Sequence, residues 1–242
     1  RWLGLDWDEG PDRGGPAAPY VQSEASAHYD RALAQLQAAD LLYYCDCSRR
    51  EIASLVSAPH AGEGEPVYPG RCRAFGLQKR SFRRAPAIRL AVPPGEISVL
   101  DRWQGSLVQD VAQEVGDFVL RRGDGVTTYQ LAVVVDDLRM GVTEVVRGAD
   151  LLASAPRQAM LAGLLGAAAP NFAHLPMVLG GDGGRLAKRL PRFQLQERRV
   201  AGEDPLVVVG EMATLLGLVE AGPRGILTSL EDLVLQADLT RL

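Results

Sequence analysis

The stretch TTYQLAVVVDDLRMGVTEVVRGADLLASAPRQAMLAGLL, residues 127–165, decides the fold that the sequence predicts. Within it, residues 131–135 are a short apolar run rich in β-branched valine, which favours a strand buried on both faces of a parallel sheet. A second β-branched run, residues 142–146, predicts another strand. Ser154 and Pro156 then indicate the start of a helix, because serine is a good N-cap and proline suits the first turn. We therefore expect an α/β fold built on a parallel sheet.

Polar side chains stand where each of the two expected strands ends. Asp136 and Asp137 follow the first run, and Arg147 follows the second. The carboxyl ends of strands in an open α/β sheet line the crevice where ligands bind. We therefore expect one edge of the sheet to gather Tyr129, Asp136, Asp137, Arg147 and Asp150. Taken singly, V-V-D-D and R-G-A-D also occur as ordinary sheet-edge and turn chemistry.

Length and composition are those of an ordinary globular protein. The chain has 242 residues, of which 47% are hydrophobic and 23% charged, and its net charge is −4. This length predicts one or two domains with a substantial core. No apolar run approaches the roughly 20 residues of a membrane helix, and no signal peptide opens the chain. Three cysteines disfavour a disulfide framework and favour the reducing cytosol.

All three cysteines fall within one short window. Cys45 and Cys47 flank a single residue, and Cys72 follows a turn. Structural zinc takes four ligands in a tetrahedron, so a fourth ligand such as His, Asp or Glu would be needed. His60 is one candidate for it. Spacing alone leaves a zinc site and a group of buried free thiols equally open.

A local basic stretch follows the first two cysteines. Residues 70–90 contain no acidic residue and seven basic ones: Arg71, Arg73, Lys79, Arg80, Arg83, Arg84 and Arg89. A solvated face and a surface that contacts nucleic-acid phosphates both explain this pattern.

The other elements follow from ordinary periodicity. Residues 20–39 predict an amphipathic surface helix that Ser23 can cap, with Tyr29, Leu33 and Leu36 at helical spacing. Short strands are expected at residues 87–92, 97–103, 117–121 and 171–179. Residues 205–242 are expected to be mostly helical, with a break at Gly222-Pro223.

Several motifs together resemble the glutamyl-type class I aminoacyl-tRNA synthetases. They are Y-Q-L-A-V-V-V-D-D from Tyr129, G-V-T-E-V-V-R-G-A-D-L from Gly141, S-A-P-R-Q from Ser154, and C-x-C followed by Y-x-x-x-C. The resemblance implies a Rossmann-type core with a zinc-bearing insertion and a short helical C-terminal part. It also implies one zinc ion per chain, held by Cys45, Cys47, Tyr68 and Cys72.

The same resemblance divides the chain and assigns its substrates. It implies a remnant of the first nucleotide-binding half at residues 1–42, the insertion at 43–118, the second nucleotide-binding half at 119–184, and a signature loop with a helical end at 185–242. Tyr129 and Arg147 would bind glutamate. The loop Arg185, Leu186, Ala187, Lys188 and Arg189 resembles the second class I signature, in which Lys188 would be catalytic and bind the phosphates of ATP, accompanied by Mg²⁺.

The resemblance also predicts a reaction and its partners. The family's His-containing ATP signature is absent from the sequence, so we expect an N-terminally truncated form, whose own activity is open. No anticodon-binding region follows, which favours the short paralogues that transfer glutamate to the queuosine base of tRNA(Asp). Glutamate, ATP and tRNA(Asp) are the expected partners, without DNA or a membrane, and a monomer is favoured. A fragment of a glutamyl-tRNA synthetase and a non-catalytic zinc- and RNA-binding module are the alternatives.

Overall fold

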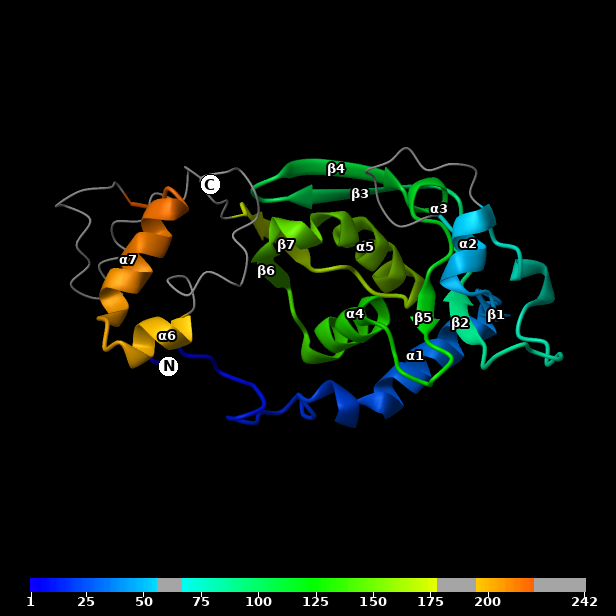
Figure 1. Ribbon diagram of the computed structural model, residues 1–242, viewed down its shortest axis with the longest axis horizontal. Helices are drawn as coiled ribbons and strands as arrows, with labels where there is room; N and C mark the ends of the chain where they lie inside the picture. The colour runs from blue at the N-terminus through cyan, green and yellow to red at the C-terminus, as the bar shows by residue number, and fades with distance from the viewer. Residues whose placement is uncertain (56–66, 178–194, 220–242) are drawn as a thin grey trace.

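The computed structural model describes residues 1–55, 67–177 and 195–219. Two small sheets and the helices between them form its body, and α6 (Leu195–Val200) and α7 (Pro205–Leu215) lie at one end (Figure 1). Asp204 caps α7 by accepting a hydrogen bond from the backbone N–H of Leu206. No helix in these described ranges is long and apolar enough to span a bilayer.

The first sheet has three antiparallel strands in the order β1-β2-β5. They are β1 (Leu42–Cys45), β2 (Ala87–Leu90) and β5 (Val119–Arg121), and Cys45 pairs with Ala87 at the end of the β1–β2 ladder. The helix α2 (Arg49–Leu55) and the 3-10 turn η2 (Arg73–Phe75) follow the strand and the turn that carry the cysteines. This sheet therefore holds the cysteine-bearing part of the chain.

The second sheet has the order β4-β3-β7-β6. Its strands are β4 (Gly105–Asp110), β3 (Glu96–Asp101), β7 (Asn171–Leu175) and β6 (Glu144–Gly148). β3, β7 and β6 are parallel, whereas β4 joins β3 as an antiparallel hairpin. η3 (Ala149–Ser154) and α5 (Ala155–Leu164) connect β6 to β7, which makes a β-α-β unit. The expected parallel sheet is thus present in a mixed form, with an antiparallel edge strand.

The expectation of a strand at residues 131–135 is wrong. These residues lie in the helix α4 (Tyr129–Met140), which ends at Gly141 in the left-handed conformation with φ 68°. Leu131, Ala132, Val134 and Val135 are buried together because they share one helical face. Packing against α1 and α5 therefore outweighs the weak strand preference of the three valines.

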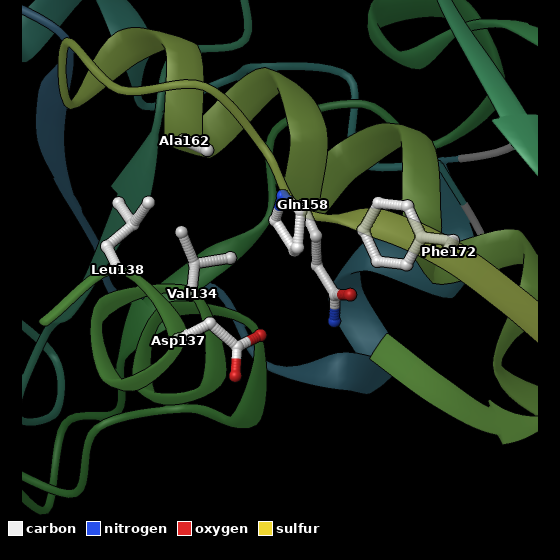
Figure 2. Close-up of a pocket in the computed structure, with 7 residues that line it drawn as sticks. Val134, Asp137, Leu138, Gln158, Ala162 and Phe172 are labelled. Carbon is white, nitrogen blue, oxygen red and sulfur yellow. The ribbon is translucent and has the colours of Figure 1, made fainter. Parts of the chain in front are cut away.

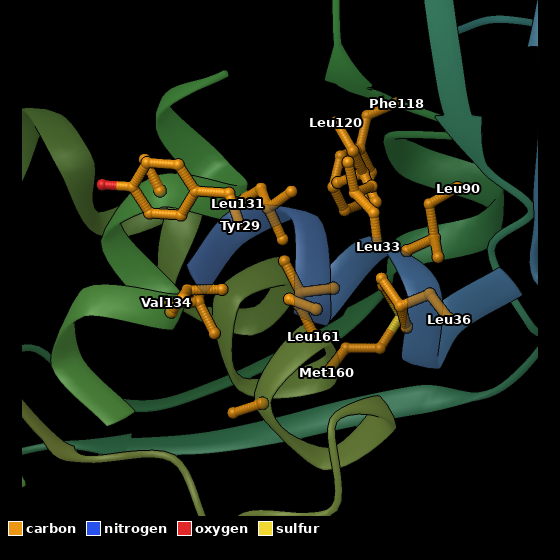
Figure 3. Close-up of a cluster of buried hydrophobic side chains, with 14 of the residues drawn as sticks. Tyr29, Leu33, Leu36, Leu90, Phe118, Leu120, Leu131, Val134, Met160 and Leu161 are labelled. Carbon is orange, nitrogen blue, oxygen red and sulfur yellow. The ribbon is translucent and has the colours of Figure 1, made fainter. Parts of the chain in front are cut away.

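The main core lies where three helices meet the first sheet. Figure 3 shows Tyr29, Leu33 and Leu36 of α1 (Ser26–Ala38) facing Leu131 of α4 and Leu161 of α5. Leu90, Leu120 and Phe118 extend the core toward β2 and β5. The predicted buried stripe of α1 is confirmed. Ser23 does not cap this helix, since it lies in a separate 3-10 turn, η1 (Gln22–Glu24), and Ala25 is the N-cap.

Strands are present at the other predicted positions with different bounds: β6 is shifted from residues 142–146, and β3 begins one residue before the predicted 97. The strands β1 and β4 and the short helix α3 (Val111–Glu114), capped by Asp110, were not predicted. At α5, Pro156 occupies the first turn as predicted. Ser154 is the N-cap residue, but its side chain forms no capping hydrogen bond. The expected break at Gly222-Pro223 lies outside the described residues.

Candidate functional site

Arg147 and Tyr129 meet at the end of β6 and the start of α4. Arg147 Nη1 donates to the Tyr129 hydroxyl at 3.4 Å, and Nη2 donates to the Leu151 carbonyl at 3.4 Å. Arg147 Nε donates to His174 Nε2 at a shorter 2.9 Å. Arg147 is half-buried, Tyr129 is 45% exposed, and no carboxylate of the described residues forms an ion pair with this guanidinium. A partly desolvated cation beside a phenol suits an anionic ligand.

Asp136 and Asp137 were expected at the end of a strand, but they lie on the helix α4. Asp137 lies close enough to Arg147 for the two charges to interact, although burial is the larger influence on the pKa of its carboxyl group and raises it. Asp136 instead accepts hydrogen bonds from Gln22, Tyr29 and Arg139, and so ties the N-terminal segment to α4. Asp150 lies next to Gly148, where an added Cβ would be 2.8 Å from Asp150 Oδ1. Of the five polar residues predicted to gather, Tyr129, Asp137 and Arg147 form the site.

A small pocket lies between α4, α5 and β7. Figure 2 shows the side chains of Val134, Asp137 and Leu138 on one side, across from Phe172. Burial in this apolar setting raises the pKa of Asp137 to about 6, and Arg147 opposes the shift. The buried Gln158 also lines the pocket and donates to Gln130 Oε1 at 2.9 Å.

Two residues that lie behind Arg147, namely His174 and Asp101, were not predicted from the sequence. His174 is completely buried on β7 and lies between Arg147 and Asp101, with 2.6 Å from its Nδ1 to Asp101 Oδ2. A histidine inside an expected apolar strand was the only local signal. Nothing near Asp101 in the sequence indicates a partner 73 positions away.

The predicted metal ligands converge. The sulfur atoms of Cys45, Cys47 and Cys72 all lie within 4.8 Å of one another, and Cys47 Sγ and Cys72 Sγ are 3.7 Å apart. The Tyr68 hydroxyl is 3.4 Å from Cys45 Sγ and 3.7 Å from Cys47 Sγ. Two sulfurs that bind one zinc at about 2.3 Å in a tetrahedron are roughly 3.8 Å apart. The donor set is therefore compatible with a tetrahedral metal ion.

Positive charge surrounds these sulfur atoms. Arg80 Nη2 donates to Cys72 Sγ at 3.7 Å, and the buried Arg89 lies 4.1 Å over the Tyr68 ring. The Cys45 thiol is buried, which alone would raise its pKa, but hydrogen bonding with Tyr68, with the Cys47 backbone and with Arg89 lowers it overall. Burial raises the pKa of the Cys47 thiol to about 11. The positive charge of the arginines stabilises deprotonated sulfur atoms, and a bound metal cation would stabilise them further.

Most of the basic stretch is used within the fold. Arg80 and Arg83 pair with the buried Asp46 at 2.8 and 3.5 Å, and Arg73 pairs with Asp117 at 3.1 Å. Arg84 pairs with Glu51, while Arg89 donates to the Asp117 carbonyl. Within the described ranges only Arg71 and Lys79 of the seven form no ion pair or side-chain hydrogen bond, so the stretch is chiefly structural.

Some predicted residues lie outside the described part of the chain. They are His60, the alternative zinc ligand, and the whole signature loop with Arg185, Leu186, Ala187, Lys188 and Arg189. Their assignments stay predictions.

Comparison with known proteins agrees with this fold. Residues 1–240 match the model of the catalytic domain of class I tRNA synthetases (E and Q). A glutamyl-Q tRNA(Asp) synthetase of Symbiobacterium thermophilum is 52% identical over 91% of this chain and 69% of its own length. The protein of the same name in Nitratidesulfovibrio vulgaris is 47% identical over 90% of this chain and 69% of its own.

A solved structure extends the likeness to three dimensions. The glutamate-tRNA synthetase of Elizabethkingia anophelis superposes with a TM-score of 0.79 at 28% identity and covers 100% of this chain. The chain spans about half of that protein, 54% of its length. The chain belongs to the class I tRNA synthetases of the glutamate and glutamine type. Within that family, its similarity to two glutamyl-Q tRNA(Asp) synthetases extends over about nine tenths of the chain.

Proposed function

We propose that this chain carries the glutamate site of a ligase that activates glutamate with ATP and transfers it to the queuosine base of tRNA(Asp). The observation that carries the proposal is Arg147, a half-buried cation that forms no ion pair with a carboxylate of the described residues. The names of the relatives at 52% and 47% identity support the same acceptor.

The geometry suits a carboxylate of glutamate. Arg147 Nε is already engaged by His174, so the two Nη groups, whose present contacts are long at 3.4 Å, are the donors that remain for a ligand. Because the Tyr129 oxygen accepts from Nη1, its own O–H proton is free to be donated to the same ligand. Two charge-assisted contacts would fix the substrate for reaction.

The chemistry then proceeds in two steps. A carboxylate oxygen of glutamate attacks the α-phosphorus of ATP, the bond between that phosphorus and the bridging oxygen breaks, and pyrophosphate leaves. A hydroxyl oxygen of the acceptor attacks the acyl carbon of the adenylate, AMP leaves with the electrons of the C–O bond, and the hydroxyl proton passes to solvent. Lys188 would offset the charge on the phosphates, with Mg²⁺ accompanying ATP.

A structural zinc belongs to the same proposal. Cys45, Cys47 and Cys72 would hold it as thiolates, with Tyr68 as the fourth ligand. The 3.4 and 3.7 Å contacts between the Tyr68 hydroxyl and two of the sulfurs support this choice. The ion would fix the turn at Cys72 against β1 and thereby order the insertion, for which we propose residues 43–118. The remaining parts are then 1–42, 119–184 and 185–242.

Transfer of labelled glutamate tests the proposal. The protein should load glutamate onto a queuosine-containing anticodon stem-loop of tRNA(Asp), which has no 3′ acceptor end, and should not load the same stem-loop with guanine at that position. Loading of tRNA(Glu) instead would favour the glutamyl-tRNA synthetase alternative. Binding of the stem-loop without glutamate-dependent pyrophosphate exchange would favour the non-catalytic RNA-binding module.

A pair of arginine variants tests the site itself. Arg147→Ala should weaken glutamate binding by about 2–5 kcal/mol, because it removes one member of a buried charge pair. Arg102→Ala is the matched control, since Arg102, on the β3–β4 turn, is exposed and pairs with Glu144 of β6 at 2.7 Å. Equal glutamate affinity in the two variants would remove Arg147 from the site.

A further inference from the structure

A buried polar chain crosses the second sheet behind Arg147. It runs from Asp101 at the end of β3 through His174 on β7 to Arg147 on β6. The strand register puts His174 directly opposite Arg147. His174 is 0% exposed and Asp101 is 2% exposed. Buried polar groups are stabilising only when their hydrogen bonds are made, so this chain needs a reason to be there.

The contacts determine where the proton on His174 lies. An arginine Nε always carries hydrogen, so the His174 Nε2 that faces it at 2.9 Å must be the acceptor. The ring is therefore neutral, with its proton on Nδ1, which donates to Asp101 Oδ2 at 2.6 Å. A protonated ring would set an N–H against the N–H of Arg147. The chain has one direction of donation, from Arg147 to His174 to Asp101.

Asp101 is a fixed anchor for this chain. Its Oδ1 accepts from the backbone N–H groups of Trp103 at 3.0 Å, Gln104 at 2.9 Å and His174 at 3.1 Å. β3 ends at Asp101, so the side chain replaces the strand as the acceptor for the His174 backbone. Burial alone would raise the pKa of Asp101, but these hydrogen bonds and that from the His174 ring hold it below its usual value.

Arg147 is held on two sides as a result. His174 takes the Nε edge of the guanidinium, and the Phe172 ring lies 5.3 Å from the guanidinium carbon. Phe172 and His174 are themselves stacked, with ring centroids 5.9 Å apart. Only the Nη edge is left toward Tyr129, where the contacts are longer. An arginine fixed in this way loses little side-chain freedom when it binds a ligand.

We propose that His174 and Asp101 are positioning residues that orient Arg147 for the glutamate carboxylate. The inference rests on the proposed function, because it takes the role of Arg147 from there. A histidine that only fills the core would support folding without any specific effect on glutamate. A positioning role predicts that substitution of His174 raises KM for glutamate, whereas a purely structural role predicts no specific effect on that constant.

Two substitutions, His174→Asn and His174→Gln, separate these roles, because their side-chain amides replace different ring nitrogens of His174. In His174→Asn the amide can donate to Asp101 in place of Nδ1, but nothing replaces the Nε2 acceptor. We expect KM for glutamate to rise about ten- to a hundredfold, as for loss of a hydrogen bond to a charged group, with KM for ATP unchanged. His174→Gln places an amide oxygen near the Nε2 position and should recover part of this loss.

Asp101→Asn tests the proton arrangement. The new amide would donate to His174 Nδ1, which forces the ring proton onto Nε2 and against Arg147. KM for glutamate should rise as in His174→Asn. Arg102→Ala, beside Asp101 but outside the chain of hydrogen bonds, should leave it unchanged.

Pyrophosphate exchange at varied glutamate, for these variants and for Arg147→Ala, gives the decision. A raised KM in Arg147→Ala with an unchanged KM in His174→Asn would overturn this inference and leave the proposed function intact. An unchanged KM in Arg147→Ala would instead overturn the proposed glutamate site. Nitrogen-15 spectra of the three histidines give a readout independent of activity, and a proton on His174 Nε2 at neutral pH would also overturn the inference.

Discussion

Replacing Asp137 with asparagine should change how the stability of the protein depends on pH. Asp137 lines the apolar pocket between α4 and α5, and its pKa is raised from 3.8 to about 6, chiefly by burial. A carboxyl group with a raised pKa in the folded state binds its proton more tightly there than in the unfolded chain. The stability it contributes is complete below about pH 4 and is lost as the pH rises through about 6. Asparagine is neutral throughout and removes this dependence.

The size of the effect follows from the pKa difference. Each pKa unit corresponds to about 1.4 kcal/mol, so a change from 3.8 to about 6 gives an upper value of roughly 3 kcal/mol. Asp137 is only partly buried, and water screens part of this energy. We therefore expect the free energy of unfolding of the wild type, relative to Asp137→Asn, to fall by about 1–2 kcal/mol between pH 4 and pH 7.

Urea unfolding at closely spaced pH values measures this difference. Other carboxylates titrate in the same range, so only the difference between the wild type and the variant is compared. Asp8→Asn serves as the control, because Asp8 is exposed and has no hydrogen bond or ion pair within the described residues. Parallel curves for the wild type and Asp137→Asn would refute the reasoning, since they would mean that water reaches this carboxyl group freely.

Three further outcomes are expected. Protein purified without added zinc should contain one zinc ion per chain, and Cys47→Ser should reduce this occupancy by metal analysis; a folded, metal-free chain with three reactive thiols would contradict the assignment. Asp117→Asn should lower the free energy of unfolding by about 2–3 kcal/mol, because the buried carboxylate accepts from Tyr43, Arg73 and the Val92 backbone; a loss under about 0.5 kcal/mol in urea unfolding would show that these bonds are replaceable. Arg147→Lys should weaken glutamate binding in calorimetry much as Arg147→Ala does, since an ammonium group cannot present two parallel N–H donors.

The sequence was sufficient for some elements whose pattern is local. The strand β6 and the start of α5 follow from a β-branched run and from Pro156 in a first turn. The spacing of the three cysteines grouped them, and the resemblance to a known family supplied Tyr68 as the fourth member. The structure adds that all four side chains already point toward one another.

The sequence was insufficient where the deciding contacts are distant. A run of three valines fits a strand or a helix, and only the wider spacing that includes Leu138 and the stop at Gly141 favours the helix. The strand interpretation placed Asp136 at a ligand edge, whereas the helix turns it toward Tyr29. The pairing of His174 with Asp101 joins residues 73 positions apart and leaves no periodic trace.

The parallel register of β6 and β7 is what makes the site possible. Arg147 pairs with His174 and Val145 pairs with Phe172, so the histidine and the phenylalanine lie on the same face as the arginine. A slip of one residue would put Ala173 or Leu175 opposite Arg147 and turn the imidazole to the other face. Arg147 would then lose its acceptor, and Asp101 would lose the ring that it orients. Because α5 packs on β3 and connects β6 to β7, the helix that covers the sheet also maintains this register. The arrangement of Arg147, His174 and Asp101 in the candidate site is therefore a consequence of core packing.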